Sequence, residues 1–372
     1  MQEFKFSAPC LLGIEGLIAN ELKFMDIKNV NAENGRVTFT GDYGTMARAN
    51  ICSRYSERIQ ILLAEFDATS FEELFCGVKN IAWEEFLGKD DAFPVKGRSL
   101  SSQLASIPNC QKIIKKAIVE RMKLNYRTDW FEETGAVHQV QFLILKNKVS
   151  IMLDTSGAGL HKRGYRAIAN DAPIKETLAA AMADLSRVRP NHTVIDPMCG
   201  SGTILIESAL KAMKIACGSM RTFASQDWQQ VAPQYFANEF ERAKSLENRE
   251  CDFQGIGYDI DGDTIKIAQE NARKAGVADR IKFEKRDIND FKLEFERATV
   301  ITNPPYGERM LDIRGAEELY KVMGRKFKPK DGWSYTIISP DDDFEKCFSR
   351  SADKRRKLYN GMLKCQVYMY YK

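Results

Sequence analysis

The sequence predicts an α/β protein whose carboxyl-terminal part is a doubly wound, mostly parallel sheet with an antiparallel hairpin at its end. From about residue 174 onward, helical segments alternate with short apolar strands, which is typical of parallel sheets. The chain then closes with two strands that follow each other directly around Asn360-Gly361, a dipeptide that suits a type I′ turn. The parallel sheet should therefore gain an antiparallel edge.

Length and composition set the bounds of the interpretation. The chain has 372 residues, enough for two or three domains, and is 44% hydrophobic and 28% charged, as in ordinary globular proteins. The net charge of +4 permits a nucleic-acid partner without requiring one. The sequence lacks apolar runs of the ~20 residues that a membrane span needs. We therefore expect a soluble, cytoplasmic protein; the sequence does not predict its oligomeric state.

Cysteine and histidine usage argues against a metal site. The nine cysteines are scattered without a C-x-x-C pair, and the three histidines form no H-E-x-x-H motif. We expect reduced thiols and no metal.

Three domains are predicted along the chain. Residues 1–65 should form a small α/β domain and residues 66–157 a second α/β unit, followed by a larger domain at 158–372. Expected helices of these domains lie at residues 13–24, 109–124 and 174–185. Expected strands lie at residues 3–7, 36–40, 140–145, 149–153, 194–196, 255–259, 281–284, 300–303 and 333–339.

Three acidic residues follow predicted parallel strands, where ligands of open α/β sheets bind. Asp196 precedes a glycine turn, Asp259 ends the next strand and Asp287 follows the third. These carboxylates suit the ammonium, the ribose hydroxyls and the adenine amino group of S-adenosylmethionine. A dinucleotide site is the alternative, but Leu205 breaks the G-x-G-x-x-G pattern, and 59 residues rather than ~20 separate Gly200 from Asp259.

The segment Asn303-Pro304-Pro305-Tyr306 follows another apolar strand and is the predicted catalytic edge. Because proline has a fixed φ and lacks an N–H group, the segment should hold the Asn303 side chain and the Pro304 carbonyl towards one point. Two oxygen acceptors can bind an exocyclic NH₂ group, and Tyr306 can stack on an extruded base. The pattern predicts methyl transfer to a planar exocyclic nitrogen; a purely structural Pro-Pro loop is the alternative.

Basic residues near aromatic or helical segments are candidates for phosphate contacts, which supply most sequence-independent affinity for nucleic acids. Solvated charge is the alternative for any single cluster. The predicted RNA-binding residues are Lys112, Lys115, Lys116, Arg163 and Arg166.

With these motifs, the chain resembles the THUMP-domain RNA guanine-N2 methyltransferases, specifically the RlmL-like enzymes of bacterial 23S rRNA. The resemblance is carried by residues 4–17, 95–102, 110–117, 160–166 and 172–179, besides the two motifs above. It implies a ferredoxin-like amino-terminal domain, a ferredoxin-like THUMP domain that binds RNA, and a class I S-adenosylmethionine methyltransferase domain with an insertion after its first helix. It also implies that Pro173 and Ile174 pack against the cofactor.

The predicted cofactor site combines the strand ends, the glycine turn and their neighbours. Its members are Pro173, Ile174, Asp196, Pro197, Met198, Cys199, Gly200, Ser201, Gly202, Thr203, Tyr258, Asp259, Ile260, Asp287, Ile288 and Asn303.

The resemblance leaves the methyl acceptor open. We expect a guanine-N2 enzyme acting on 23S rRNA or a large-subunit assembly intermediate. The alternatives are a tRNA guanine-N2 enzyme, then a DNA adenine-N6 enzyme, and finally a non-catalytic RNA-binding assembly factor. The second methyltransferase module of the fused relatives is not implied by these motifs.

Overall fold

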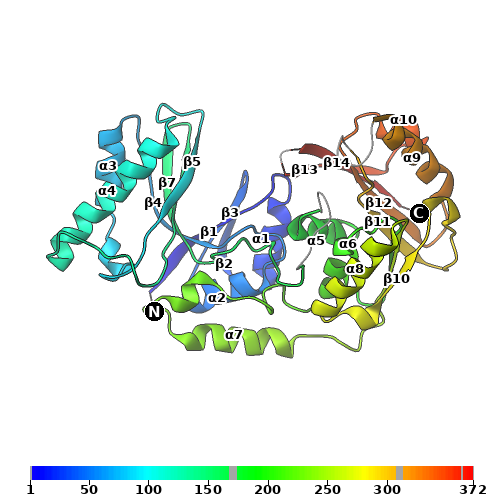
Figure 1. Cartoon of the computed structure of the whole chain (residues 1–372), viewed down its shortest axis with the longest axis horizontal. Helices are drawn as coiled ribbons and strands as arrows, with labels where there is room; N and C mark the ends of the chain where they lie inside the picture. The colour runs from blue at the N-terminus through cyan, green and yellow to red at the C-terminus, as the bar shows by residue number, and fades with distance from the viewer. Residues whose placement is uncertain (1, 167–173, 307–312, 362, 372) are drawn as a thin grey trace.

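The computed structural model describes residues 2–166, 174–306, 313–361 and 363–371. It is built around two seven-stranded sheets, one in each half of the chain (Figure 1). The blue and cyan half holds the first sheet, and the green to red half holds the second. None of the described helices is long and apolar enough to cross a membrane.

The first sheet is shared by both predicted amino-terminal domains. Its order is β2-β3-β1-β4-β7-β6-β5, and β4 connects the two parts because it pairs with both β1 and β7. The domain boundary predicted between residues 65 and 66 therefore falls inside β4. The strands are β1 (Phe4–Pro9), β2 (Lys28–Glu33), β3 (Arg36–Gly41), β4 (Gln60–Asp67), β5 (Val95–Leu100), β6 (Val140–Leu145) and β7 (Lys148–Asp154). The sequence prediction omitted β2, β4 and β5. The edge strand β2 is largely exposed and lacks an apolar alternation.

Helices accompany this sheet, and the sequence analysis expected two of them, at residues 13–24 and 109–124. The helix expected at residues 109–124 is α4, and it buries Ile114, Ala117, Ile118 and Met122 on one face. The four helices are α1 (Glu15–Phe24), α2 (Tyr43–Cys52), α3 (Phe71–Lys79) and α4 (Ile107–Tyr126). A capping box of Ser70 and Glu73 begins α3. The Ser70 side chain accepts the backbone N–H of Glu73, and the Glu73 side chain accepts the backbone N–H of Ser70.

The second sheet confirms the predicted fold class. Its order is β10-β9-β8-β11-β12-β14-β13, with parallel pairs up to β12 and antiparallel pairs of β14 with β12 and β13. The strands are β8 (Thr193–Asp196), β9 (Gln254–Asp259), β10 (Ile281–Lys285), β11 (Ala298–Thr302), β12 (Trp333–Ser339), β13 (Lys354–Asn360) and β14 (Leu363–Tyr370). The helices are α5 (Glu176–Leu185), α6 (Thr203–Ala212), α7 (Pro233–Ser245), α8 (Gly262–Lys274), α9 (Ile313–Lys326) and α10 (Phe344–Phe348).

The turn of the carboxyl-terminal hairpin is shifted by one residue from the prediction. Asn360 still belongs to β13 and pairs with Leu363, so the two-residue loop begins at Gly361. Gly361 has a φ of +64°, which an L side chain rarely adopts. Asn360 does not have the positive φ that a central residue of a type I′ turn requires. The second loop residue lies outside the described residues.

The segment after α6 connects the two halves. It contains α7, which lies beside α2 in Figure 1. Arg48 of α2 pairs with Glu239 of α7 through a 2.8 Å contact between Nη2 and Oε1. The Gly218 N–H donates to the Ile51 carbonyl at 2.8 Å. The insertion expected after the first helix thus packs on the amino-terminal domain.

Candidate active site at the carboxyl edge of the second sheet

The predicted site residues gather at the point where the strand order reverses. The chain runs from β8 outwards to β9 and β10, then returns to β11 on the other side of β8. Ligands of open α/β sheets bind at this reversal, beyond the carboxyl ends of the strands. Asp196 ends β8, Asp259 ends β9 and Asn303 directly follows β11. The fold therefore brings these three side chains to one edge.

The glycine turn between β8 and α6 leaves room for a ligand. Gly200 and Gly202 have φ values of +53° and +79°, a region that favours glycine. A Cβ atom on Gly200 would meet no heavy atom within 4 Å, whereas one on Gly202 would lie 3.0 Å from the ring of Phe283. Gly202 is thus required by close packing, and Gly200 exposes backbone to open space. Such space fits a cofactor that approaches the turn.

The acidic side chains hold this turn in place. Asp259 Oδ2 accepts the N–H of Gly200 at 2.9 Å, and its Oδ1 accepts the N–H of Asp261 at 3.0 Å. Asp196 Oδ1 accepts the N–H of Met198 at 3.2 Å and the hydroxyl of Thr302 at 2.8 Å. The turn, the end of β9 and the end of β11 are therefore linked by hydrogen bonds to two carboxylates.

Asp196 is the electrostatically unusual group of the site. Its side chain is buried, with 1% of the residue exposed. Burial raises its pKa to about 7, against the effect of the hydrogen bonds from Thr302 and Met198, and the nearby Asp259 carboxylate adds to the rise. A cation placed beside Asp196 would favour its ionised form. The sulfonium and ammonium groups of S-adenosylmethionine are cations of this kind.

The remaining predicted cofactor residues line or support the same edge. Asp287 is half-buried, and its Oδ1 accepts the N–H of Asn289 at 2.7 Å. Ile260 is 65% exposed, so its apolar side chain is available to a ligand. Residues that are buried or partly buried are Pro197, Met198, Cys199, Ser201, Thr203, Tyr258 and Ile288. Burial raises the pKa of the Cys199 thiol well above its usual value, so Cys199 is uncharged.

Arg166 and Ile174 are linked to the end of this turn through Thr203. Ile174 is buried, and its carbonyl accepts a hydrogen bond from Arg166 at 3.0 Å. Arg166 also donates to the hydroxyl of Thr203 and lies 3.5 Å from a carboxylate oxygen of Glu176. Arg166 thus supports the start of α6 at the glycine turn, although the sequence suggested an RNA contact. Pro173, also predicted here, lies outside the described residues.

The segment at residues 303–306 presents an acceptor without a partner. Asn303 Oδ1 is buried and accepts no hydrogen bond from the described part of the chain. Buried polar atoms are rarely left in this state unless a ligand satisfies them. Pro304 is buried and Pro305 half-buried, which fixes the backbone around Asn303. The Tyr306 hydroxyl accepts a 2.8 Å hydrogen bond from Asn360 Nδ2, so the ring is anchored to the end of β13.

One predicted RNA-binding residue is corrected by the structure. Arg163 is only 2% exposed, lies 3.4 Å from a carboxylate oxygen of Glu207 and donates to the carbonyl of Leu160 at 2.9 Å. It also donates to the carbonyl of Arg54. A buried guanidinium with these partners cannot contact RNA, and it instead joins the amino-terminal domain to α6. Glu207 is an acidic residue within an otherwise apolar helix sequence. It was the signal for a buried partner of Arg163 that the sequence reasoning missed.

The three predicted RNA-binding lysines on α4 differ in exposure and in hydrogen-bond partners. Lys112 and Lys116 are exposed, four residues apart on one face of the helix. Lys115 donates to the carbonyl of Phe93 at 3.1 Å and to Glu133, and burial lowers its pKa. Lys112 and Lys116 therefore remain the available cations of this predicted set.

Three residues of the site were not singled out by the sequence. Thr302 donates to Asp196, Asn360 holds Tyr306, and Asn271 Nδ2 donates to the carbonyl of Ser201 at 3.1 Å. Thr302 adjoins the Asn-Pro-Pro-Tyr motif and could have been included. Asn271 lies 70 residues from its partner, so only the tertiary structure reveals it. Among the described residues, no group of three or more His, Cys, Asp or Glu side chains could hold a metal ion.

Three family models match the chain. A model described as the RMKL-like methyltransferase domain matches residues 163–369, one described as the RlmL ferredoxin-like domain matches residues 5–60, and the THUMP domain model matches residues 68–154.

Curated relatives agree with these matches. YpsC of Bacillus subtilis, whose assignment as an RNA methyltransferase is itself provisional, is 41% identical over 100% of this chain and 97% of its own length. The ribosomal RNA large subunit methyltransferase K/L of Psychromonas ingrahamii is 33% identical over 97% of this chain. The match covers 49% of that protein, so the chain spans about half the length of the K/L relatives.

Solved structures show the same architecture. A predicted N6-adenine-specific DNA methylase from Listeria monocytogenes is 41% identical, with a TM-score of 0.94 over 100% of this chain and 97% of that chain. The methyltransferase candidate SMU.472, solved in complex with S-adenosylhomocysteine, is 39% identical, with a TM-score of 0.93 over 100% of this chain and 98% of that chain. Together with the site geometry, these matches identify S-adenosylmethionine as the cofactor.

Proposed function

Because the chain belongs to the RMKL-like methyltransferase family, we propose that it transfers the methyl group of S-adenosylmethionine to the exocyclic N2 of a guanine in 23S rRNA. The observation that carries this proposal is the buried Asn303 Oδ1, which has no partner among the described residues. This acceptor lies at the same sheet edge as the cofactor turn, and an NH₂ donor from a flipped base would satisfy it.

The neighbouring residues would position the base. Asn303 Oδ1 and the Pro304 carbonyl accept the two hydrogens of the exocyclic amine, and the ring of Tyr306 stacks against the base plane. The amine lone pair then points at the methyl carbon. A bond forms between N2 and this carbon while the carbon–sulfur bond breaks, and the nitrogen loses one proton to water. Positioning and electrostatics account for this chemistry without a strong general base.

The predicted cofactor residues have roles that follow from their places. Asp196 would face the positive charges of the cofactor, Asp259 the ribose and Asp287 the adenine amino group. Asp259 already accepts two backbone N–H groups, but each carboxylate oxygen can accept a further hydrogen bond from a hydroxyl.

RNA as the acceptor class is supported by the amino-terminal half. The THUMP model matches residues 68–154, and relatives named as large subunit methyltransferases match nearly the whole chain. The exposed Lys112 and Lys116 of α4 lie in this unit and would contact phosphates. A tRNA guanine-N2 enzyme is the second candidate, since the same Asn-Pro-Pro-Tyr chemistry serves both acceptors.

The test is transfer of labelled methyl from S-adenosylmethionine to unmodified large-subunit rRNA, unmodified tRNA and DNA, followed by nucleoside analysis. We expect N2-methylguanosine from rRNA only. N2-methylguanosine from tRNA would favour the second candidate, and N6-methyladenine in DNA would refute the guanine assignment.

The Asn303→Ala variant serves as the matched control. It should bind RNA as the unchanged protein does, while kcat falls by roughly two orders of magnitude because one positioning acceptor is lost. Unchanged kcat would remove Asn303 from the proposed mechanism.

A further inference from the structure

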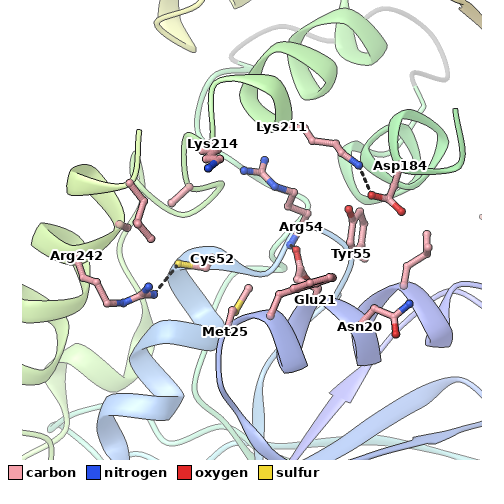
Figure 2. Close-up of a pocket in the computed structure, with 15 residues that line it drawn as sticks. Asn20, Glu21, Met25, Cys52, Arg54, Tyr55, Asp184, Lys211, Lys214 and Arg242 are labelled. Carbon is pink, nitrogen blue, oxygen red and sulfur yellow. Dashed lines mark hydrogen bonds and ion pairs between the residues drawn. The ribbon is translucent and has the colours of Figure 1, made fainter. Parts of the chain in front are cut away.

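Two helices of the second half, α5 and α6, pack on each other and begin at the cofactor edge. Arg166 joins their starts, because it donates to the carbonyl of Ile174, two residues before α5, and to the hydroxyl of Thr203, the first residue of α6. Near their other ends, Lys211 pairs with Asp184 (Figure 2). A shift of α5 would therefore be transmitted to the glycine turn from which α6 begins.

The start of α5 receives no cap from its own N-cap residue. Lys175 occupies that position and makes no side-chain hydrogen bond to the first turn. The free N–H groups of a helix start carry partial positive charge, which a nearby carboxylate stabilises. Glu176 of the first turn lies 3.5 Å from Arg166, and the Lys175 ammonium adds positive charge. This end of α5 therefore favours a further carboxylate from elsewhere in the chain.

Glu57 of the amino-terminal domain, between α2 and β4, supplies that carboxylate. Its Oε1 accepts the hydroxyl of Thr177, in the first turn of α5, at 2.8 Å. Its Oε2 lies 3.3 Å from both Lys175 Nζ and His161 Nδ1. Burial alone would raise the pKa of Glu57, but these partners lower it to about 2, so the group is ionised.

The segment that carries Glu57 is anchored in the amino-terminal domain and also reaches α6. The Glu57 N–H donates to the carbonyl of Pro9, at the end of β1, at 2.8 Å. Three residues earlier, Arg54 donates to the carbonyls of Leu210 and Ile215 at the carboxyl-terminal end of α6. Figure 2 shows Arg54 at this end of the helix pair. One short segment thus places a carboxylate at the start of α5 and a guanidinium at the end of α6, as the helix dipoles favour.

We propose that Glu57 is a positioning residue for the cofactor, because it holds the start of α5 and, through Arg166, keeps the glycine turn in the geometry that binds S-adenosylmethionine. The amino-terminal domain is then part of the cofactor site, in addition to its proposed RNA contacts. The inference rests on the proposed placement of the cofactor at the glycine turn. It is independent of which nucleic acid accepts the methyl group.

The test measures the affinity of the full chain for S-adenosylhomocysteine by isothermal titration calorimetry, at a temperature well below the melting temperature of each variant. Glu57→Ala should weaken the affinity about fivefold, the equivalent of one hydrogen bond. Glu57→Gln keeps an acceptor for Thr177 and should recover part of this loss. Thr177→Val should weaken the affinity as well, and its addition to Glu57→Ala should cause no further loss, because both remove the same contact.

Glu65→Ala is the matched control. The side chains of Glu65 and Glu57 are 19% and 20% exposed, and Glu65 also pairs with two cations, Arg36 at 2.8 Å and Lys5 at 3.2 Å. These partners belong to β3 and β1 of the first sheet. Glu65→Ala should therefore lower the melting temperature about as much as Glu57→Ala does, but leave the affinity for S-adenosylhomocysteine unchanged. Equal effects of both variants on affinity would indicate a general loss of stability and would overturn the inference.

Asp259→Asn separates this inference from the placement of the cofactor, because Asp259 is the proposed ribose acceptor. If Asp259→Asn weakens binding while Glu57→Ala binds normally, only the positioning role is wrong. If Asp259→Asn itself binds normally, the cofactor lies elsewhere and both proposals fail. Should Glu57→Ala not fold, unchanged affinity in both Glu57→Gln and Thr177→Val overturns the positioning role.

Discussion

At the scale of single residues, burial decides what the charged groups of the site can do. Asp196 is almost completely buried, and its pKa is raised to about 7. A carboxylate with a raised pKa stabilises the folded state most when it is protonated, so its contribution is present below about pH 4 and is lost as the pH rises through about 7. A bound cation reverses this preference by favouring the ionised form.

Affinity for S-adenosylmethionine should therefore depend on pH. If ionised Asp196 faces the cofactor, affinity should fall roughly tenfold as the pH is lowered from about 7.5 to about 6. Isothermal titration calorimetry across this range would measure the change. Asp196→Asn keeps an acceptor for Thr302 and Met198 but removes the titration, so its affinity should be weaker and independent of pH. A flat profile for the unchanged protein would contradict the assignment.

The basic residues that the sequence analysis grouped as RNA-binding candidates also differ in their expected roles. The exposed Lys112 and Lys116 should contact phosphates, whereas the buried Arg163 compensates Glu207. The double variant Lys112→Ala/Lys116→Ala should weaken RNA binding and lower the salt dependence by about two released ions, at an unchanged melting temperature. Filter-binding titrations at several salt concentrations would measure both quantities.

Arg163→Ala should show the opposite pattern. It leaves the buried Glu207 with the Tyr165 hydroxyl but without the ion pair to Arg163, which costs about 3 kcal/mol in comparable cases. We expect a melting temperature lower by several degrees. Loss of RNA affinity in a folded Arg163→Ala protein, with stability unchanged, would restore the original sequence prediction.

At the scale of elements, the carboxyl-terminal hairpin supports the segment 303–306, which is the proposed catalytic segment. Asn360 ends β13 and donates to the Tyr306 hydroxyl at 2.8 Å. This hydrogen bond holds the Tyr306 ring by its hydroxyl group. The ring is the proposed stacking surface for the base. Asn360 is thus a positioning residue that acts through Tyr306.

Removal of this hydrogen bond should affect turnover more than cofactor binding. A single hydrogen bond contributes about 1 kcal/mol, so Asn360→Ala should lower kcat roughly fivefold while affinity for S-adenosylhomocysteine stays constant. Tyr306→Phe, which lacks the acceptor, should give a similar decrease, and the two changes should not add. Additive effects in the double variant would show that Asn360 acts by another route.

At the scale of the whole molecule, the hairpin also touches the amino-terminal domain. Arg356 Nε donates to the carbonyl of Gly13 at 2.9 Å. Gly13 has a φ of +97°, and a Cβ atom there would lie 2.6 Å from the Lys357 carbonyl oxygen. The first domain and the hairpin that holds Tyr306 therefore meet at a position where only glycine fits.

The Gly13→Ala substitution should push the hairpin away from the first domain. We expect a lower melting temperature, by a few degrees, and a lower kcat because the hairpin shifts. Gly35→Ala is the control, since Gly35 has a φ of +77° but its added Cβ would meet only Leu12, at 3.6 Å. Equal effects of both variants on stability and kcat would mean that backbone strain alone is responsible.

Local patterns in the sequence determined much of the second sheet. Strand ends, the glycine turn and the Asn-Pro-Pro-Tyr segment are set by neighbouring residues, so the strands at 333–339 and 281–285 and the edge that holds Asp196, Asp259 and Asn303 were predictable. The family resemblance supplied the domain types that the models match.

Only the tertiary structure decided which side chains remain available. Arg163 is withdrawn from RNA by Glu207, 44 residues away, and Tyr306 is fixed by Asn360, 54 residues away. The single sheet that joins both amino-terminal units likewise depends on β4 pairing with strands on either side of it. These contacts connect residues distant in sequence, and their energies depend on burial and on partners that periodicity and composition do not contain.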